Sequence, residues 1–197
     1  MSIDPNKITI GSVFKRNGRV LKVIDKHHVK LSKGGACQQV KCMDVQDKSI
    51  MEMRLNVNET LEEVYISKKV LEFSYSSDQV INFVDDEYHG VELNERDLGM
   101  LFALFSVDLP AEQMPRIEIE YFTGENENVN IIVNVKLLED VILTVLQTAD
   151  SIKGETAKSA DKPAVLEGGI KTKVPSHVNI GDKVVLNKMD LSYVSKK

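Results

Sequence analysis

The stretch Ser12-Val-Phe-Lys-Arg-Asn-Gly-Arg-Val-Leu-Lys-Val23 decides the fold, because it holds two short apolar runs around Asn17-Gly18. Asn-Gly is the strongest two-residue signal for a β-hairpin, since both central residues of a type I′ turn need positive φ. Further β-like runs follow at Cys37 to Val45 and Ile50 to Leu55. About five short strands in about 60 residues predict a small closed barrel, in which closure removes exposed sheet edges.

The middle of the chain predicts strands around one helix. Runs at Lys69 to Tyr75 and Gln79 to Val84 are β-like, and residues 116–121 alternate so that Ile117, Ile119 and Tyr121 share one face. A helix is expected near 94–108, where Asn94 can cap the first turn. Its apolar stripe, which we interpret as a core face, consists of Leu98, Leu101, Phe102 and Phe105.

The remaining chain predicts a third β set. It begins with runs at Val129 to Val135 and Val141 to Val145, and short strands are expected again from about residue 164 onwards. The economical interpretation is a mainly β chain of three small barrel domains, at residues 1–64, 65–128 and 129–197. A single sandwich of all 197 residues is the alternative.

Charge is distributed unevenly over these three segments. Residues 1–64 carry 11 basic and 8 acidic side chains, residues 65–128 carry 4 and 14, and residues 129–197 carry 10 and 8. Phosphate contacts supply most of the affinity for nucleic acid, so an RNA partner is expected to meet the two ends of the chain. The acidic middle would avoid RNA or face a basic protein surface.

Composition excludes several classes of protein. No apolar run approaches the ~20 residues of a membrane helix, and the N-terminus lacks a signal peptide's apolar stretch, so a cytoplasmic location is expected. Cys37 and Cys42 lie five apart on an expected strand and point to opposite faces, which predicts reduced thiols and no shared metal. No motif of a hydrolase, metalloprotease or nucleotide-binding loop is present, so no enzymatic activity is expected.

A basic loop is the most informative candidate site. Between Lys15 and Lys41 there are eight basic residues and one acid, Asp25. Within this stretch, Val29-Lys-Leu-Ser-Lys-Gly-Gly-Ala36 separates two β-like runs, and its glycines permit a tight loop that carries Lys33 outward. Such a cation suits contact with a phosphate-rich partner. The alternative is an ordinary solvated hairpin tip.

A second motif lies near the C-terminus, in Lys162-Pro-Ala-Val-Leu-Glu-Gly-Gly-Ile-Lys-Thr-Lys-Val-Pro175, and Gly181 follows it. In the first motif, Lys33 is followed by Gly34-Gly35-Ala36. Together, in this order and at this distance, the two motifs resemble those of bacterial elongation factor P, and the resemblance extends along essentially the whole chain.

The resemblance implies an SH3-like (KOW-type) barrel followed by two OB-fold barrels, in an L-shaped outline similar to a tRNA. It implies a monomer without cofactor that binds the ribosome beside peptidyl-tRNA and stimulates peptide-bond formation at consecutive prolines. Lys33 would reach toward the peptidyl-transferase centre, in many members after extension by a modifying enzyme, commonly with β-lysine. The tip loop would comprise Lys30, Leu31, Ser32, Gly34 and Gly35, and further RNA contacts are expected at Arg16, Arg19 and Lys41.

This chain departs from the family pattern at Leu31-Ser32, where the loop usually reads Pro-Gly. Two alternatives remain beside the elongation factor. An elongation-factor-P-like paralogue typically has arginine at the tip, and Lys33 argues against it. A general OB-fold RNA-binding protein relies on aromatic stacking, and 6% aromatic residues without tryptophan argue against that class.

Overall fold

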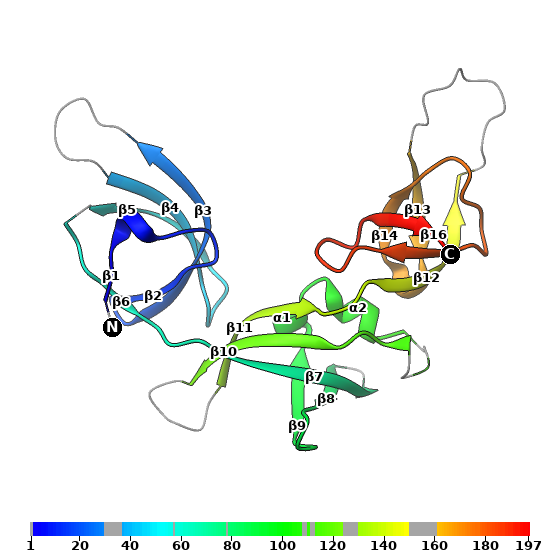
Figure 1. The fold of residues 1–197 in the computed structure, drawn as a ribbon, viewed down its shortest axis with the longest axis horizontal. Helices are drawn as coiled ribbons and strands as arrows, with labels where there is room; N and C mark the ends of the chain where they lie inside the picture. Colours follow the sequence, from blue (N-terminus) through cyan, green and yellow to red (C-terminus); the bar gives the residue numbers. More distant parts are fainter. Residues whose placement is uncertain are drawn as a thin grey trace. The chain divides into compact units, whose positions relative to one another are not determined.

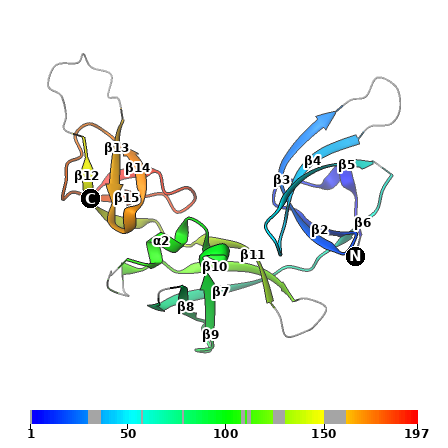
Figure 2. The same cartoon turned by 180° about the vertical axis from the view of Figure 1, so that it is seen from behind.

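The computed structural model describes residues 2–29, 37–56, 58–77, 79–107, 110, 113–123, 130–149 and 161–197, with the backbone alone at 28 and 29. Over these residues the chain is mainly β and forms three sheets (Figures 1 and 2), which confirms the predicted fold class. The chain divides into two compact units. One comprises residues 1–67 and 120–133, and the other comprises residues 68–119 and 134–197.

The N-terminal sheet has six strands in the order β1-β6-β2-β3-β4-β5. Asn17 and Gly18 have φ of 51° and 76° and join β2 to β3, so the predicted hairpin is confirmed. The elements are β1 (Ser2–Ile3), the 3-10 helix η1 (Pro5–Lys7), β2 (Val13–Arg16), β3 (Arg19–Val29), β4 (Cys37–Asp44), β5 (Ile50–Asn56) and β6 (Leu61–Glu63).

The core of this sheet is built from alternate residues of its strands. Phe14, Leu21, Val23, Val40 and Leu55 are buried in one cluster, together with Cys42. Cys37 is also buried, and both cysteines are free thiols. Burial raises the pKa of the Cys42 thiol to about 11, so this sulfur stays protonated at neutral pH.

The middle sheet has five strands in the order β11-β10-β7-β8-β9. Its elements are β7 (Ser67–Ser76), β8 (Val80–Val84), β9 (Gly90–Asn94), α1 (Glu95–Leu98), α2 (Leu101–Phe105), β10 (Ile117–Thr123) and β11 (Asn130–Leu137). The sequence placed the run at 129–135 in a third β set, and this was wrong, because β11 lies beside β10 in the middle sheet. The sequence also missed β9.

The expected single helix at 94–108 is two short helices. The cap is confirmed, since the Asn94 side chain accepts from the backbone of Arg96 and Asp97, and Asp97 completes a capping box. Gly99 then adopts φ 56° and ψ −127°, which ends α1 after one turn. In the apolar stripe Phe102 is only half-buried, and Leu104, which the sequence analysis did not select, is fully buried.

The predicted alternation in β10 holds for Ile117 and Ile119, which are buried, but not for Tyr121, which is half-buried. Phe122 is buried instead. It joins Val13, Val20 and Val45 of the N-terminal sheet in a second apolar cluster. The burial of β10 therefore shifts by one residue at the point where the strand enters the first compact unit.

The C-terminal sheet has five strands in the order β14-β13-β12-β15-β16. A buried lysine, Lys162, donates through Nζ to the carbonyl of Ala149 at 2.8 Å, which closes the start of β13 against the end of β12. The elements are β12 (Val141–Thr148), β13 (Lys162–Leu166), the 3-10 helix η3 (Glu167–Gly169), β14 (Lys171–Val174), β15 (Lys183–Leu186) and β16 (Tyr193–Lys196).

Candidate nucleic-acid interface

The β3–β4 ladder carries the loop that the sequence singled out. The two strands are antiparallel, and their last described pair is Val29 with Cys37. Seven residues connect that pair, and Lys33 is the fourth of them. Lys33 and the other predicted loop residues, which are Lys30, Leu31, Ser32, Gly34 and Gly35, lie outside the described residues.

The stem of this hairpin is firmly held. Its strands pair from Leu21 and Asp44 to Val29 and Cys37, with one irregularity between Val23 and Asp25. On the outer part of β3 the Lys26 ammonium donates to the carbonyl of Ile8 at 2.7 Å, which ties β3 to the segment after η1. The ladder therefore fixes both ends of the loop side by side.

Most basic side chains of the stretch from Lys15 to Lys41 are engaged within the protein. Lys22 Nζ lies 3.4 Å from the carbonyl oxygen of Val133, and Lys26 is bound to Ile8 as described. Lys15 also has an intramolecular partner. Several cations of this stretch thus bond to other segments of the same protein. The positive charge that is available to a partner molecule is therefore smaller than the count of basic residues suggests.

Arg16 and Arg19, two of the predicted RNA contacts, both lie close to acids. Arg16 forms an ion pair with Glu59 at 2.8 Å, and its side chain is only 28% exposed. Arg19 lies 3.6 Å from the buried carboxylate of Asp44. Arg19 also begins β3, so it lies about 30 Å along the strand from Val29, at the other end of the hairpin from the loop.

Lys41, the third predicted contact, lies on β4, four residues after Cys37. In register it stands between Asp25 of β3 and Glu52 of β5. Opposite charges that face each other across strands attract, so Lys41 has an acid opposite it on each side. Arg16 and Arg19 stand opposite each other across β2 and β3, whereas Lys41 pairs with β3 six residues further along, at Asp25. The contact of all three with RNA stays a prediction.

Gln38 is a polar residue inside the stem, one residue after Cys37. It lies on the same face of β4 as Val40 and Cys42, and all three are buried. Its Oε1 has no hydrogen-bond partner among the described residues.

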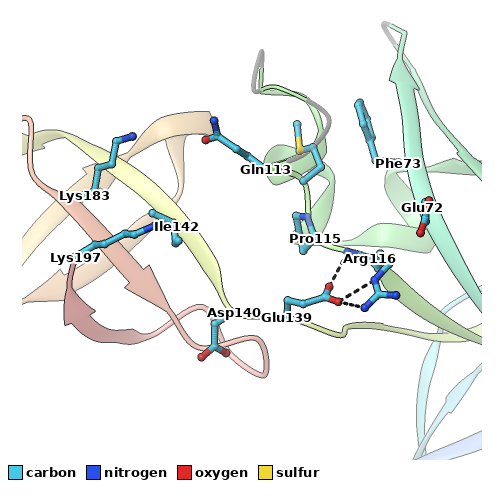
Figure 3. Close-up of a pocket in the computed structure, with 11 residues that line it drawn as sticks. Glu72, Phe73, Gln113, Pro115, Arg116, Glu139, Asp140, Ile142, Lys183 and Lys197 are labelled. Atoms are coloured by element: carbon cyan, nitrogen blue, oxygen red, sulfur yellow. Dashed lines mark hydrogen bonds and ion pairs between the residues drawn. The ribbon is translucent and has the colours of Figure 1, made fainter.

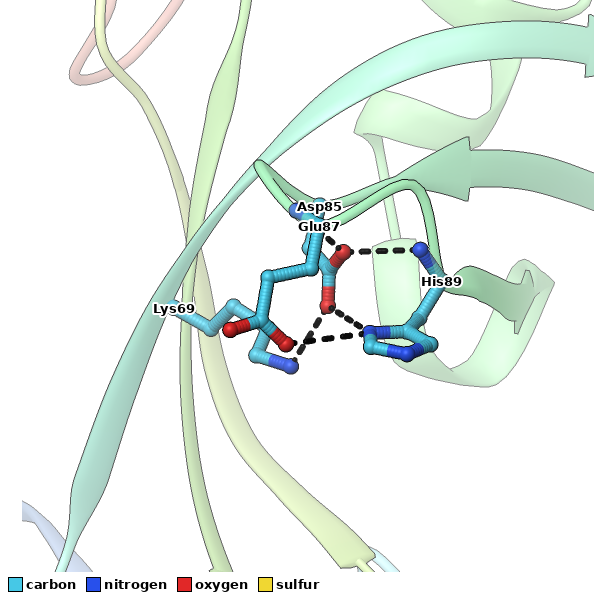
Figure 4. A network of polar contacts seen from close by, with 4 residues as sticks. All are labelled: Lys69, Asp85, Glu87 and His89. Atoms are coloured by element: carbon cyan, nitrogen blue, oxygen red, sulfur yellow. Dashed lines mark hydrogen bonds and ion pairs between the residues drawn. The ribbon is translucent and has the colours of Figure 1, made fainter.

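A second polar network lies in the middle sheet (Figure 4) and was not found from the sequence. The Asp85 side chain is buried and accepts from Lys69 Nζ at 2.7 Å and from the backbone of Glu87 and His89 at 3.0 and 2.8 Å. These bonds, led by the one from Lys69, hold the pKa of Asp85 well below its usual range. Asp85 is thus a permanent anion that shapes the turn before β9, where Tyr88 adopts a φ of 62°, and cannot act as a proton donor at neutral pH.

Among the described residues no group of three or more His, Cys, Asp or Glu side chains could hold a metal ion. None of the helices described is long and apolar enough to cross a membrane.

Comparison with known proteins gives matches at both ends of the chain. The model of the elongation factor P KOW-like domain matches residues 5–61, and that of the elongation factor P C-terminal domain matches residues 141–196. Elongation factor P of Limosilactobacillus reuteri is 31% identical over 187 residues, which cover 94% of this chain and 95% of that protein. The chain belongs to the elongation factor P family. It is therefore a translation elongation factor.

Other relatives agree along the whole length. Elongation factor P of Parvibaculum lavamentivorans is 28% identical over 197 residues, covering 100% of this chain and 99% of that protein. A solved structure of eukaryotic translation initiation factor 5A from Methanococcus jannaschii can be superposed on this protein with a TM-score of 0.45 and 17% sequence identity. The superposition covers 68% of this chain and 95% of the chain of that structure. The family assignment rests on the sequence matches and does not need this structural likeness.

Proposed function

We propose that this elongation factor binds the ribosome beside peptidyl-tRNA and stimulates peptide-bond formation at consecutive prolines, with Lys33 as the residue that acts. Family membership supports the general role. The observation that supports the specific role is the β3–β4 register, in which Val29 pairs with Cys37, so that the seven residues between them, with Lys33 at their centre, connect two paired strands.

The partners of the other cations support the choice of Lys33. Arg16 and Arg19 are close to Glu59 and Asp44, and Lys22 and Lys26 donate to backbone carbonyls. The charge of these four side chains is thus partly used inside the protein, which favours another cation of the stretch as the RNA contact. Within this basic stretch, the loop is thus the best place from which to contact RNA.

The chemistry fits a factor that positions reactants. Proline is a secondary amine with a fixed φ, so it is a poor nucleophile in the geometry that peptide transfer requires. Holding the peptidyl-tRNA still lowers the barrier, because alignment removes entropy before the reaction. The chain forms no covalent intermediate in this scheme. The ribosome performs the reaction, and Lys33 braces the RNA backbone near it.

The test is a reconstituted translation system that makes a reporter with three consecutive prolines. We compare no factor, the intact protein, Lys33→Ala and Lys33→Arg, with Arg96→Ala as a control that removes one exposed cation from the acidic middle segment. A hydrogen bond to a charged group contributes about 1.5–3 kcal/mol, so Lys33→Ala should lower the rate at the prolines about 10- to 150-fold. Arg96→Ala should change it little.

Two results would contradict the proposal. If the intact protein does not relieve stalling, with or without modification of Lys33, the assignment to proline stalling is wrong. If Lys33→Ala works as well as the intact protein, the role of the loop is wrong and the family role stands. Intact mass of the protein from its native cell shows whether a modifying enzyme extends Lys33 despite Leu31-Ser32 in place of Pro-Gly.

A further inference from the structure

The connection between the middle and the C-terminal sheets is unusually well bonded. Three residues, Leu138 to Asp140, join β11 to β12 within the second compact unit. None of them is glycine or proline. Side chains and backbone from both sheets form hydrogen bonds with this short segment, so its conformation is more restrained than that of a linker without such bonds.

From the middle sheet, Arg116 binds the connection immediately before β10. Its backbone carbonyl accepts from Leu138 N at 2.9 Å, and its backbone N–H donates to Glu139 Oε2 at 2.9 Å. Its guanidinium donates to Glu139 Oε1 through Nε at 2.9 Å and through Nη2 at 2.5 Å (Figure 3). Both oxygens of Glu139 are therefore used, and this carboxylate raises the pKa of Arg116.

From the C-terminal sheet, Lys188 binds the same connection. Its backbone N–H donates to Asp140 Oδ1 at 2.9 Å, and its Nζ donates to the carbonyl of Leu138 at 3.0 Å. The segment is thus held on one side by Arg116 and on the other by Lys188, so a rotation at this point must break bonds on at least one side.

A second contact joins the two sheets at η3. Gly168 packs so closely on α2 that an added Cβ would lie 2.5 Å from Val107 Cγ2 and 2.8 Å from the Ala103 carbonyl oxygen. An open pocket of about 840 Å³ lies beside the connection, and Figure 3 shows the Arg116–Glu139 pair at its wall. Phe73 and Pro115 line it from the middle sheet, and Ile142 and Lys183 line it from the C-terminal sheet.

We propose that Arg116 and Glu139 form a latch that sets the angle between the middle and C-terminal sheets, with the Gly168 contact as the second fixed point. When the latch is intact, the two walls of the pocket, one from each sheet, stay at a fixed separation. When the bonds between the guanidinium and the carboxylate are lost, the connection keeps the bonds to the backbone of residue 116 and those to Lys188, and the C-terminal sheet swings on the η3 contact. The latch is independent of the proposed role of Lys33.

The test measures the distance between the two sheets in the full chain. Genetically encoded spin labels at Ser76 on β7 and Ser195 on β16, both exposed, avoid the buried cysteines. Double electron–electron resonance should give one narrow distance in the parent protein. Loss of a well-aligned ion pair should raise the population outside that distance about fivefold in Arg116→Gln and in Glu139→Gln.

The control variants make the result specific to the latch. The double variant Arg116→Gln/Glu139→Gln should be no broader than either single one, because both changes break one interaction. Arg96→Gln, an equal loss of charge on exposed α1, should leave the distance unchanged. A parent protein that is already broad, single variants that stay narrow, or an Arg96→Gln variant that broadens equally would each overturn the proposal. Circular dichroism on every variant verifies that the sheets remain folded.

Discussion

Replacement of Gly168 by alanine should destabilise the protein through two separate costs. Gly168 has φ 73°, and a residue with a Cβ loses about 1–2 kcal/mol in this left-handed conformation. The new Cβ would also lie 2.5 Å from Val107 and 2.8 Å from a backbone oxygen of α2, and overpacking of this kind costs about 1–3 kcal/mol. The free energy of unfolding should therefore fall by about 2–5 kcal/mol.

The neighbouring glycine supplies a matched control. Gly169 has φ 72°, and nothing lies within 4 Å of its added Cβ, so Gly169→Ala should incur the backbone cost alone. The difference between the two variants should be about 1–3 kcal/mol, which corresponds to about 2–12 °C in midpoint for a chain of this size. Differential scanning calorimetry of the parent and both variants measures it.

Two outcomes decide whether this reasoning is right. Equal midpoints for Gly168→Ala and Gly169→Ala would show that η3 does not pack on α2 as described. Addition of Val107→Ala to Gly168→Ala should restore part of the lost stability, because it removes the side-chain overlap and leaves the one with the backbone.

Three further predictions concern other parts of the chain. Asn94→Ala removes the capping box with Asp97 and should lower the unfolding free energy by about 1 kcal/mol in urea titrations; an unchanged midpoint would exclude the cap. The pKa of Asp85 is depressed by Lys69, so the stability it contributes is present above its unfolded pKa of about 3.9 and is lost as the pH falls below that value. The stability difference between the parent and Asp85→Asn should thus shrink in acid, and a constant difference would contradict this. Cys42 has a pKa of about 11 and should react with a thiol reagent at neutral pH only as fast as the barrel opens, whereas rapid labelling of the folded protein would refute its burial.

Local signals in the sequence predicted the fold well where the structure depends on neighbours along the chain. The Asn17-Gly18 turn and the Asn94 cap are set by a few adjacent residues, and both are confirmed. The sheet to which β11 belongs is set by pairing with β10, and alternation alone cannot say which strand is the partner. The break at Gly99 was visible in the sequence, but the apolar stripe across it favoured one helix.

The role of Lys33 comes from the resemblance alone and stays a prediction. The β3–β4 register shows that the two described strands on either side of its segment pair with each other. The partners of Arg16 and Lys22 come from distant strands, so a count of charges along the chain could not reveal them. The Asp85 network was missed for the same reason, since Lys69 lies on another strand than the turn it stabilises.

The closure of the β3–β4 ladder at Val29 and Cys37 has a consequence for how this family can vary. The described core of this sheet is built from residues on both sides of the seven connecting residues, with Leu21 and Val23 before them and Val40 and Leu55 after them. Connections between paired strands tolerate sequence change better than the strands they join. We therefore expect a chimaera that carries a relative's residues at 30–36 to retain the melting temperature of this protein while acquiring the relative's preference for a modifying enzyme.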